Sequence, residues 1–195
     1  MELIEAIYQR RAIRDYTSAK VAASTLNELI DAALQAPSAM NHQPWAFAVF
    51  QGRPRLLEYS VRAKAHFLAM VLAPFGFHER GDTLTDPTYN IFYNASTLLV
   101  ICARHEGLNP AEDCCLAAQN FMLAAHAAGL GTCPIGIARP WLNLPEVKEE
   151  LGIPSDVAAV FPLTVGYPAS LPAPTPRQAP DVLCWKNDNP DPAGP

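Results

Sequence analysis

The sequence predicts one domain in which helices surround a mostly internal sheet. Three apolar runs, at 45–50, 97–103 and 158–166, have the composition of buried strands, and the segments between them carry helical periodicity or helix start and stop signals. With 195 residues, 50% of them hydrophobic and 17% charged, the chain is long enough to bury a sizeable core. We find no internal repeat and no linker to a second domain.

The first predicted element is a short helix that ends in a run of arginines. Arg10, Arg11 and Arg14 follow a segment whose apolar residues repeat at helical spacing, namely Leu3, Ile4 and Ile7. A guanidinium can bind two phosphate oxygens at once, so the three arginines are a candidate phosphate site and suggest a phosphorylated cofactor. A solvated helix end, partly neutralised by Asp15, is the alternative interpretation.

A second, amphipathic helix is predicted over 21–36. Thr25 stands three residues before Glu28, which is the spacing of a capping box, and Pro37 ends the helix. One face carries Leu26, Leu29, Ile30, Ala33 and Leu34. A polar loop over 38–44 then leads into the first buried strand, and a third helix is predicted over 53–64.

Residues 65–93 combine aromatic side chains with glycines and prolines. The aromatic residues are Phe67, Phe75, Phe77, Tyr89, Phe92 and Tyr93. Such a segment could form a lid over a site. The composition slightly favours the other interpretation, an irregular segment whose aromatic rings pack on the body of the domain.

The second buried strand, 97–103, precedes a long helix. Asn109 followed by Pro110 predicts an N-cap and a first helical turn, and Gly129 predicts the end. This helix is rich in alanine and apolar almost all round, which predicts a central helix that could span a subunit interface. A short extended piece at 132–136, a helix over 140–151 and the third strand complete the body.

The chain from Pro168 onward predicts an extended tail, because eight of the 19 prolines lie there and no periodicity survives. A disordered end is one interpretation. Val182, Leu183 and Trp185 favour another, an arm that packs across a neighbouring subunit, because a solvated tail has no need of apolar anchors.

Composition excludes several classes of protein. A net charge of −5 disfavours non-specific binding to nucleic acid. Five cysteines without a C-x-x-C pair argue against a disulfide framework or a zinc site and fit a reducing cytosol. Cys114 and Cys115 look like small buried filler in the long helix, and the scattered histidines give no metal-ligand spacing, so we assign neither a thiol nucleophile nor a metal. Without a leader or a membrane-length apolar run, we expect a soluble, cytoplasmic protein that binds no membrane.

The usual glycine-rich nucleotide loops are also missing. Neither G-x-G-x-x-G nor G-x-x-x-x-G-K-[ST] occurs, so a phosphate pocket in this chain would have to be built from side chains.

Four motifs in order give the arginine run its context: residues 10–16 (RRAIRDY), 36–45 (APSAMNHQPW), 129–136 (GLGTCPIG), and a tail with 166–168 (GYP), Arg177 and 182–185 (VLCW). Together they cover nearly the whole chain, and in this order they resemble the flavin-dependent nitroreductase family.

The resemblance implies an α+β fold, an α-β-α sandwich whose central, mostly antiparallel sheet is flanked by helices. Residues 1–167 would form the FMN-binding domain, and 168–195 an extended proline-rich arm swapped onto the partner subunit. It further implies a homodimer with one FMN per subunit, each site built from both chains, with NADH or NADPH as electron donor and a small molecule as electron acceptor.

The resemblance also assigns roles to individual residues. The arginines at 10, 11 and 14 would hold the phosphate or the pyrimidine side of the flavin, with Arg177 as a further phosphate ligand. The amides of Asn41 and Gln43 can read donors and acceptors at the flavin edge, and residues 134–136 would lie against the ring and offer backbone N–H groups. The complete implied set is Arg10, Arg11, Ala12, Arg14, Pro37, Ser38, Met40, Asn41, Gln43, Pro134, Ile135, Gly136 and Arg177.

One departure from the family lies in the arginine run. The family usually reads Arg-Arg-Ser there, with the hydroxyl on phosphate, whereas Ala12 offers only its backbone N–H. The lost hydrogen bond to a charged group is worth about 1.5–3 kcal/mol if nothing compensates for it.

The function that follows is an FMN-dependent oxidoreductase that uses NAD(P)H to reduce electron-poor acceptors, such as nitroaromatics or quinones, by a ping-pong mechanism. No side chain is assigned as a catalytic acid or base, because the cofactor supplies the chemistry. The alternatives are a specialised flavoenzyme on the same fold (an enone reductase, a dehalogenase or an azoline-type dehydrogenase), a non-enzymatic flavin-binding dimer, and a structural relative that has lost FMN.

Overall fold

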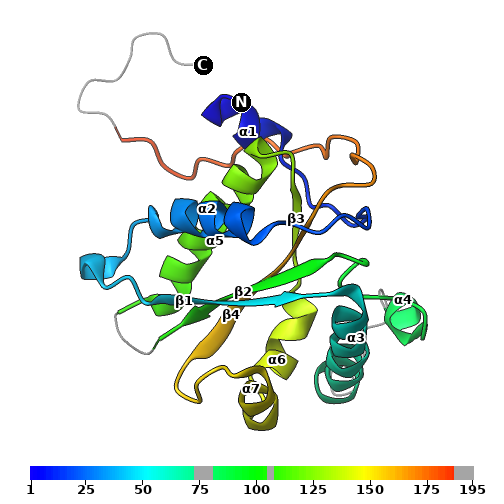
Figure 1. Cartoon of the computed structure of the whole chain (residues 1–195). Helices are drawn as coiled ribbons and strands as arrows, with labels where there is room; N and C mark the ends of the chain where they lie inside the picture. Colours follow the sequence, from blue (N-terminus) through cyan, green and yellow to red (C-terminus); the bar gives the residue numbers. More distant parts are fainter. Residues whose placement is uncertain (73–80, 105–107, 187–195) are drawn as a thin grey trace.

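A computed structural model of the chain describes residues 1–72, 81–104 and 108–186 and confirms the expected α+β architecture (Figure 1). Within these residues, four antiparallel strands form one sheet in the order β1-β2-β4-β3. The strands are β1 (Trp45–Gln51), β2 (Thr97–Ala103), β3 (Gly131–Pro134) and β4 (Ala158–Gly166). Helices cover both faces of the sheet, so the molecule has three layers.

Strand β2 forms the centre of the core. All seven of its residues are buried, and successive side chains point to opposite faces of the sheet. Leu99 and Ile101 join the apolar cluster on one face, while Leu98 and Val100 join the cluster on the other. Because helices cover both faces, the strand reads as a continuous apolar run, as the sequence predicted.

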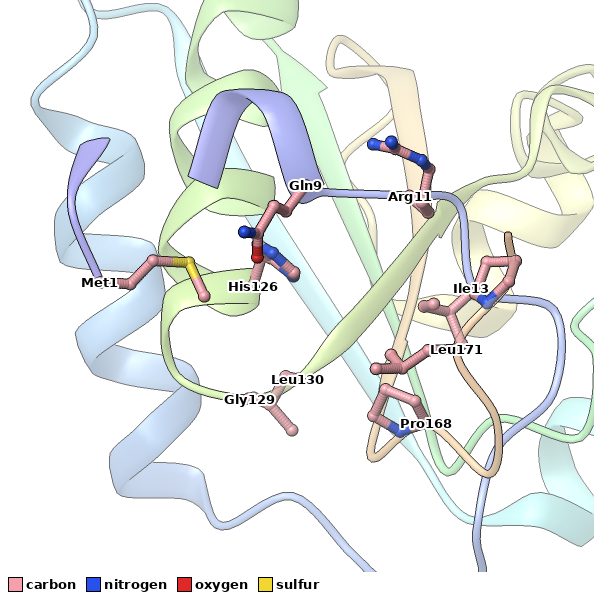
Figure 2. Close-up of a pocket in the computed structure, with 10 residues that line it drawn as sticks. Met1, Gln9, Arg11, Ile13, His126, Gly129, Leu130, Pro168 and Leu171 are labelled. Carbon is pink, nitrogen blue, oxygen red and sulfur yellow. The ribbon is translucent and has the colours of Figure 1, made fainter. Parts of the chain in front are cut away.

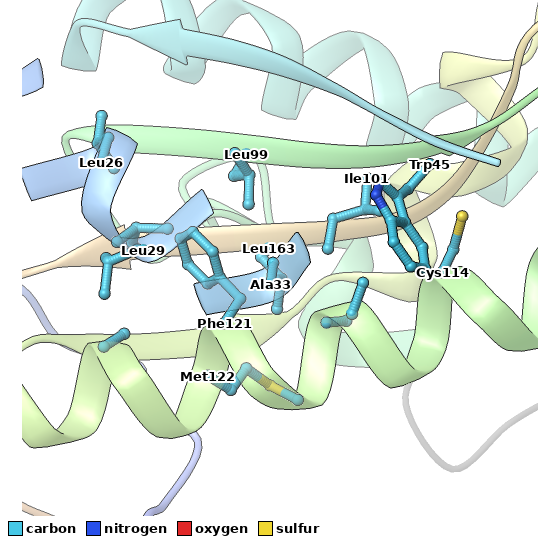
Figure 3. Packing of buried hydrophobic residues seen from close by; sticks show 14 of the residues in the cluster. Leu26, Leu29, Ala33, Trp45, Leu99, Ile101, Cys114, Phe121, Met122 and Leu163 are labelled. Atoms are coloured by element: carbon cyan, nitrogen blue, oxygen red, sulfur yellow. The ribbon is translucent and has the colours of Figure 1, made fainter. Parts of the chain in front are cut away.

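The first helical layer consists of α2 (Ala23–Leu34) and α5 (Pro110–Ala127), which lie above the sheet in Figure 1. In Figure 3 the ring of Phe121 on α5 lies between Leu29 of α2 and Leu163 of β4. Ala117 and Ala118 of α5 are fully buried, and such small side chains permit close packing. The predicted burial of this helix is therefore confirmed.

The second layer lies below the sheet and consists of α3 (Arg53–Phe67) with α6 (Arg139–Leu142) and α7 (Pro145–Leu151). A π-helical turn (Leu68–Leu72) continues α3, and a 3₁₀ turn (Gly136–Ala138) precedes α6. Arg62 of α3 ties the layer together. Its guanidinium lies over the ring of Trp141, 5.2 Å from the centroid, and Nη1 donates to Glu150 Oε1 at 2.7 Å.

The single helix predicted over 140–151 is wrong, because the segment is divided into α6 and α7. Pro145 lacks a backbone N–H and disfavours a helical residue before it, and Leu144 is accordingly extended (φ −66°, ψ 135°). Asn143 fills the break. Its side chain donates to the carbonyl oxygen of Ala159 and accepts the N–H of the same residue, both at 2.9 Å.

Two other details of the prediction are wrong. Helix α2 starts at Ala23 with Ala22 as N-cap and without a side-chain cap, so Thr25 lies inside the first turn and no capping box forms. Strand β1 was expected to be buried, but among its residues only Trp45 is, because β1 is an edge strand of the sheet. Asn109 does occupy the N-cap of α5, although its side chain makes no capping bond.

The described part of the aromatic segment packs on the domain, which confirms the packing interpretation for that part. Helix α4 (Gly81–Thr85) is followed by turns in which Phe92 is fully buried. The buried ammonium of Lys64 on α3 donates to the carbonyl oxygens of Asp86 (2.6 Å) and Tyr89 (2.9 Å). Phe75 and Phe77 lie outside the described residues.

The cysteines are all free thiols. Cys114 is buried as expected, but Cys115 is exposed, so the expectation of two buried filler residues is half wrong. Consecutive residues on a helix point in directions about 100° apart, which explains the difference. None of the helices in the described ranges is long and apolar enough to cross a bilayer.

Two neighbouring leucines of α3 test this packing. Leu56 is 1% exposed and Leu57 is 50% exposed. We expect Leu56→Ala to lower the free energy of unfolding by about 2–5 kcal/mol, because it leaves a cavity between α3 and the sheet. The matched control Leu57→Ala should cost well below that. Urea unfolding at one fixed protein concentration measures both, and equal losses would contradict the assigned orientation of α3.

Candidate functional site

The arginine run lies in an extended segment beside β3. Helix α1 (Leu3–Gln9) ends at Arg10, whose backbone is extended (φ −55°, ψ 133°). Ala12 then forms an isolated parallel bridge with Thr132, and the N–H of Ile13 donates to the carbonyl oxygen of Thr132 at 2.9 Å. We call residues 10–16 the arginine segment.

Two glycines allow the arginine segment to lie this close to the sheet. Gly131 of β3 and Gly166 of β4 are register partners. A Cβ on Gly131 would lie 2.5 Å from Cγ1 of Ile13, and one on Gly166 would lie 2.8 Å from Cδ1 of Tyr16. The buried side chains of Ile13 and Tyr16 thus occupy the space that side chains at these positions would take, and the arginines between and before them are fixed in place.

A buried hydrogen-bond chain fastens the end of the arginine segment. The hydroxyl of Thr164 donates to the carbonyl oxygen of Cys133 at 3.3 Å, which leaves its oxygen to accept the Tyr16 hydroxyl at 2.9 Å. Burial raises the pKa of Tyr16, so the phenol stays protonated and remains a donor. The chain links the segment to β4 and to the end of β3.

Four arginines converge at this place. Arg10, Arg11 and Arg14 meet Arg177 of the tail around a pocket of about 310 Å³, which Ala12, Pro172 and Thr175 also line. Burial lowers the pKa of Arg10, and the neighbouring charges of Arg11 and Arg177 lower it further. We call the four residues the arginine cluster.

No carboxylate among the described residues neutralises the arginine cluster. In residues 1–72, 81–104 and 108–186, both ion pairs belong to Arg62 on the far side of the sheet. Repulsion between gathered guanidiniums is destabilising, and an anion in the pocket would relieve it. The arrangement therefore fits a phosphate group.

Arg11 differs from the other members of the cluster. Its Nη1 donates to the carbonyl oxygens of Tyr8 (2.7 Å) and Arg10 (2.8 Å), so part of its guanidinium caps the end of α1, while its buried Nε has no partner. Figure 2 shows Arg11 beside a second pocket of about 370 Å³, whose lining also includes Gln9 and His126. Burial lowers the pKa of His126, and Arg10 and Arg11 lower it further, which favours the neutral imidazole.

Arg14 points toward the aromatic segment. Its guanidinium carbon lies 6.0 Å from the ring centroid of Tyr93, whose hydroxyl accepts a hydrogen bond from Tyr89 at 3.2 Å. Burial raises the pKa of the Cys133 thiol and outweighs the opposing effect of Arg14 and Arg10. Cys133 therefore stays protonated beside the cluster.

Residues 134–136 follow β3 directly, but their supply of N–H donors is smaller than expected. Pro134 has no N–H, and the N–H of Ile135 donates to the carbonyl oxygen of Pro162 at 2.9 Å. Ile135 is buried, whereas Gly136 is exposed. The N–H of Gly136 is thus the donor that this segment can offer to a ligand.

The remaining predicted residues form a strained surface turn, residues 37–43. Met40, Asn41 and Gln43 have positive φ angles of 51°, 59° and 48°, which are rare for residues other than glycine. The hydroxyl of Ser38 accepts the N–H of Gln43 at 3.0 Å. Backbone strain of this kind persists only where the surroundings impose it, and it often marks a functional site.

A buried carboxylate and a side-chain contact hold the 37–43 turn. Asp113, 4% exposed on α5, accepts the N–H of Ala39 at 3.2 Å. Gln43 Nε2 donates to Asn41 Oδ1 at 3.0 Å, so the two amides predicted to read a ligand pair with each other. Pro37, Met40 and both amides are exposed to solvent.

One chain does not bring all predicted residues together. In Figure 1 the light-blue 37–43 turn lies at the far left of the molecule, whereas the arginine segment lies beside β3 on the other side. The structure unites Arg10, Arg11, Ala12 and Arg14 with Arg177. Residues 134–136 continue from β3, the strand beside which the arginine segment lies, but the turn is remote. A site that uses both groups needs a second chain.

Sequence reasoning missed several residues at the cluster. Thr175 lines its pocket, Tyr93 lies against Arg14, and Tyr16 with Thr164 fastens the segment. A glycine in a buried strand often marks the close approach of another backbone or a ligand, so Gly131 and Gly166 carried a usable signal for the docking of the segment. Thr175 carried a weaker one, a hydroxyl two residues before Arg177.

Comparisons with known proteins agree on the nitroreductase family. The model of the nitroreductase family matches residues 7–167. An FMN reductase [NAD(P)H] from Bacillus subtilis is 30% identical over 184 residues, which cover 90% of this chain and 70% of the relative. A 4-nitrobenzoate reductase from a Nocardioides species is 26% identical over 203 residues, covering 86% of this chain and 81% of the relative.

A comparison with solved structures also finds a nitroreductase. The crystal structure of a nitroreductase with bound FMN from Bacteroides fragilis superimposes with a TM-score of 0.81 at 25% identity. The match covers 95% of this chain and all of the other.

The glycine pair supplies a test of how the segment is held. We expect Gly131→Ala to lower the free energy of unfolding by about 1–3 kcal/mol, because the new Cβ would displace Ile13. Gly136→Ala is the matched control, since a Cβ there meets no atom within 4 Å. Chemical unfolding of both variants measures the two free energies of unfolding. An unchanged value for Gly131→Ala would mean that the arginine segment is not packed on β3.

Proposed function

Because the chain belongs to the nitroreductase family, we propose that it is an FMN-dependent oxidoreductase that uses NADH or NADPH to reduce small electron-poor molecules, such as nitroaromatics or quinones. The observation that carries the proposal is the arginine cluster, in which Arg10, Arg14 and Arg177 line one pocket without a described carboxylate partner. The terminal phosphate of FMN is a dianion of complementary charge.

The residues of the pocket fit a phosphate in detail. Arg10, Arg14 and Arg177 provide charged donors, and Thr175 of the tail provides a hydroxyl. We propose that Thr175 replaces the serine hydroxyl that Ala12 lacks. When bound, FMN supplies the hydride chemistry, taking electrons from the nicotinamide donor and passing them to the acceptor in ping-pong order.

In this proposal, the protein's own residues bind and orient the flavin and stabilise charge on it. The arginine cluster would hold the phosphate end, and the N–H of the exposed residue Gly136 provides a donor directly after β3. Arg14, which lies against Tyr93, is placed to stabilise negative charge that develops near it. No side chain is proposed as a catalytic acid or base, so protons would come from solvent.

We further propose a homodimer whose partner chain contributes the 37–43 turn to each site. The turn and the arginine cluster are remote in one chain, and α1 exposes Leu3, Ile4 and Tyr8 with 64%, 64% and 75% of their surfaces accessible. Several large apolar side chains exposed on one short helix are typical of an interface.

The tail has two parts in this proposal. Its beginning stays on its own chain, since the N–H of Ala169 donates to the carbonyl oxygen of Asp15 at 3.0 Å and Arg177 joins the cluster. Farther along, Val182, Leu183 and Trp185 are 57%, 91% and 77% exposed. We propose that the tail, residues 168–195 in the sequence-based prediction and described here as far as 186, forms an arm, and that its part with Val182, Leu183 and Trp185 packs on the partner subunit. The free thiols support a cytoplasmic location.

The flavin itself gives the primary test. We expect the protein to purify yellow and to release FMN, not FAD, on heating, because the chain has one phosphate-sized cluster and no glycine-rich pyrophosphate loop. Anaerobic NADH or NADPH should then bleach the flavin absorption, and a nitroaromatic should restore it. A protein that stays colourless with added FMN refutes the proposal, and a flavin that no nicotinamide reduces favours a binding protein. Product analysis with enones, halogenated aromatics and azolines separates the specialised enzymes.

The arginine cluster predicts a specific loss of affinity. Arg14→Ala and Arg177→Ala should each weaken FMN binding by about tenfold or more, since a charged hydrogen bond is worth about 1.5–3 kcal/mol. Arg55→Ala, an exposed arginine outside the pocket, is the control. Titration of flavin fluorescence measures the three dissociation constants. Unchanged values for both cluster variants would place the phosphate elsewhere.

The role of Thr175 can be tested by removal and rescue. Thr175→Val keeps the shape and removes the hydroxyl, so FMN should bind about fivefold more weakly, the equivalent of about 1 kcal/mol. Adding Ala12→Ser to that variant should restore affinity, because it returns a hydroxyl to the pocket. If Thr175→Val binds FMN normally, the hydroxyl does not compensate for Ala12.

A further inference from the structure

We propose a second oxyanion site, separate from the arginine cluster, at the start of helix α3. A pocket of about 400 Å³ opens there, and its polar lining residues are Ser18, Lys20, Gln51, Arg53 and Ser96. It shares no lining residue with the pocket of the arginine cluster. The ligand chemistry we assign to it is a phosphoryl group, either free phosphate or the phosphate of a nucleotide.

The pocket lies at the positive end of a long helix. Helix α3 has 15 residues, and Gly52 at its N-cap has no side chain with which to cap it. In the first helical turn the N–H groups of Arg53 and Arg55 have no partner inside the helix and carry partial positive charge, whereas Pro54 between them has no N–H. The first turn holds no acidic residue, although acidic residues are the usual stabilising choice at this position.

Buried donors without partners form the second, independent observation. Ser96 is 5% exposed, and its hydroxyl has no hydrogen-bond partner. The buried Nε of Arg53 also lacks a partner, although Nη2 of the same guanidinium donates to the carbonyl oxygen of Tyr16 at 2.9 Å. Both residues line the pocket. Unpartnered buried donors are rare in folded proteins, and a phosphoryl oxygen accepts several hydrogen bonds, so an oxyanion is a suitable partner for donors of this kind.

The charges at the pocket agree with an anionic ligand. Lys20 and Arg53 line it, and neither forms an ion pair with any carboxylate in the described residues. Cations at the N-terminus of a helix are unfavourable unless an anion lies between them and the helix. The volume exceeds that of a phosphate alone, which leaves room for part of a molecule that carries the phosphate.

The experiment is a calorimetric titration of inorganic phosphate into the FMN-loaded protein in a phosphate-free buffer. FMN fills the arginine cluster, so phosphate should bind at one remaining place. We expect Ser96→Ala to weaken this binding about fivefold and Lys20→Gln about tenfold, since they remove a neutral and a charged donor. Lys20 is exposed, so its variant keeps the fold. Ser155→Ala and Lys186→Gln, exposed and outside the pocket, are the matched controls.

Two further arms complete the test. In flavin-free protein, phosphate should bind at two places, of which Arg177→Gln removes only one. If AMP binds more tightly than phosphate, and Ser96→Ala weakens both, the site takes a nucleotide; equal binding assigns it to free phosphate. The proposal is overturned if the FMN-loaded protein binds no phosphate at millimolar concentration, or if binding is unchanged in both Ser96→Ala and Lys20→Gln.

Discussion

The close approach of the arginine segment to the pair of strands β3 and β4 is the constraint on which the candidate site depends. Gly131 and Gly166 face each other across these strands, and Ile13 and Tyr16 fill the space where two side chains would otherwise stand. The hydrogen bond from Tyr16 to Thr164 fixes the register of this contact. Because the segment is held at both points, Arg10 and Arg14 reach the pocket without a helix or a glycine-rich loop to carry them.

The position of the arginine segment brings several positive charges close together, and their repulsion is unfavourable. Burial and the charges of Arg11 and Arg177 lower the pKa of Arg10, which means that the cationic form is destabilised there. A chain selected for stability alone would put a carboxylate beside it. The arrangement is understandable if a dianionic phosphate completes the site, since binding then stabilises the folded protein as well as the ligand. The 37–43 turn is also energetically unfavourable, because of its positive φ angles, and the buried Asp113 holds it in that conformation.

Features of the fold and the site could be predicted from the sequence where they depend on neighbouring residues, and could not where they depend on residues far apart in the chain. The apolar run of β2 and the alanine-rich α5 are determined by local pattern, and both were predicted correctly. The edge position of β1 and the break at Pro145 depend on strand order and on one residue's backbone, and both were predicted wrongly. Arg10, Arg11 and Arg14 were found because their charges lie close together in the sequence, and Arg177 was found only through the family resemblance. The contact of Ile13 with Gly131 was not predicted, and neither was the place of Thr175 in the pocket. In both cases the residues that meet are more than a hundred positions apart in the sequence.

The central claim is that the arginine cluster of one chain and the 37–43 turn of another form one flavin site, and subunit mixing tests it most directly. One chain carries Arg14→Ala with Arg177→Ala, and a second carries Asn41→Ala with Gln43→Ala. Each homodimer should bind FMN poorly. In the mixed dimer, one site receives an intact cluster and an intact turn, while the other receives both defects. The account predicts that the mixed dimer binds one FMN with the affinity of the unmodified protein. Loss of affinity at both of its sites would contradict the account, because it would mean that each site is built within a single chain.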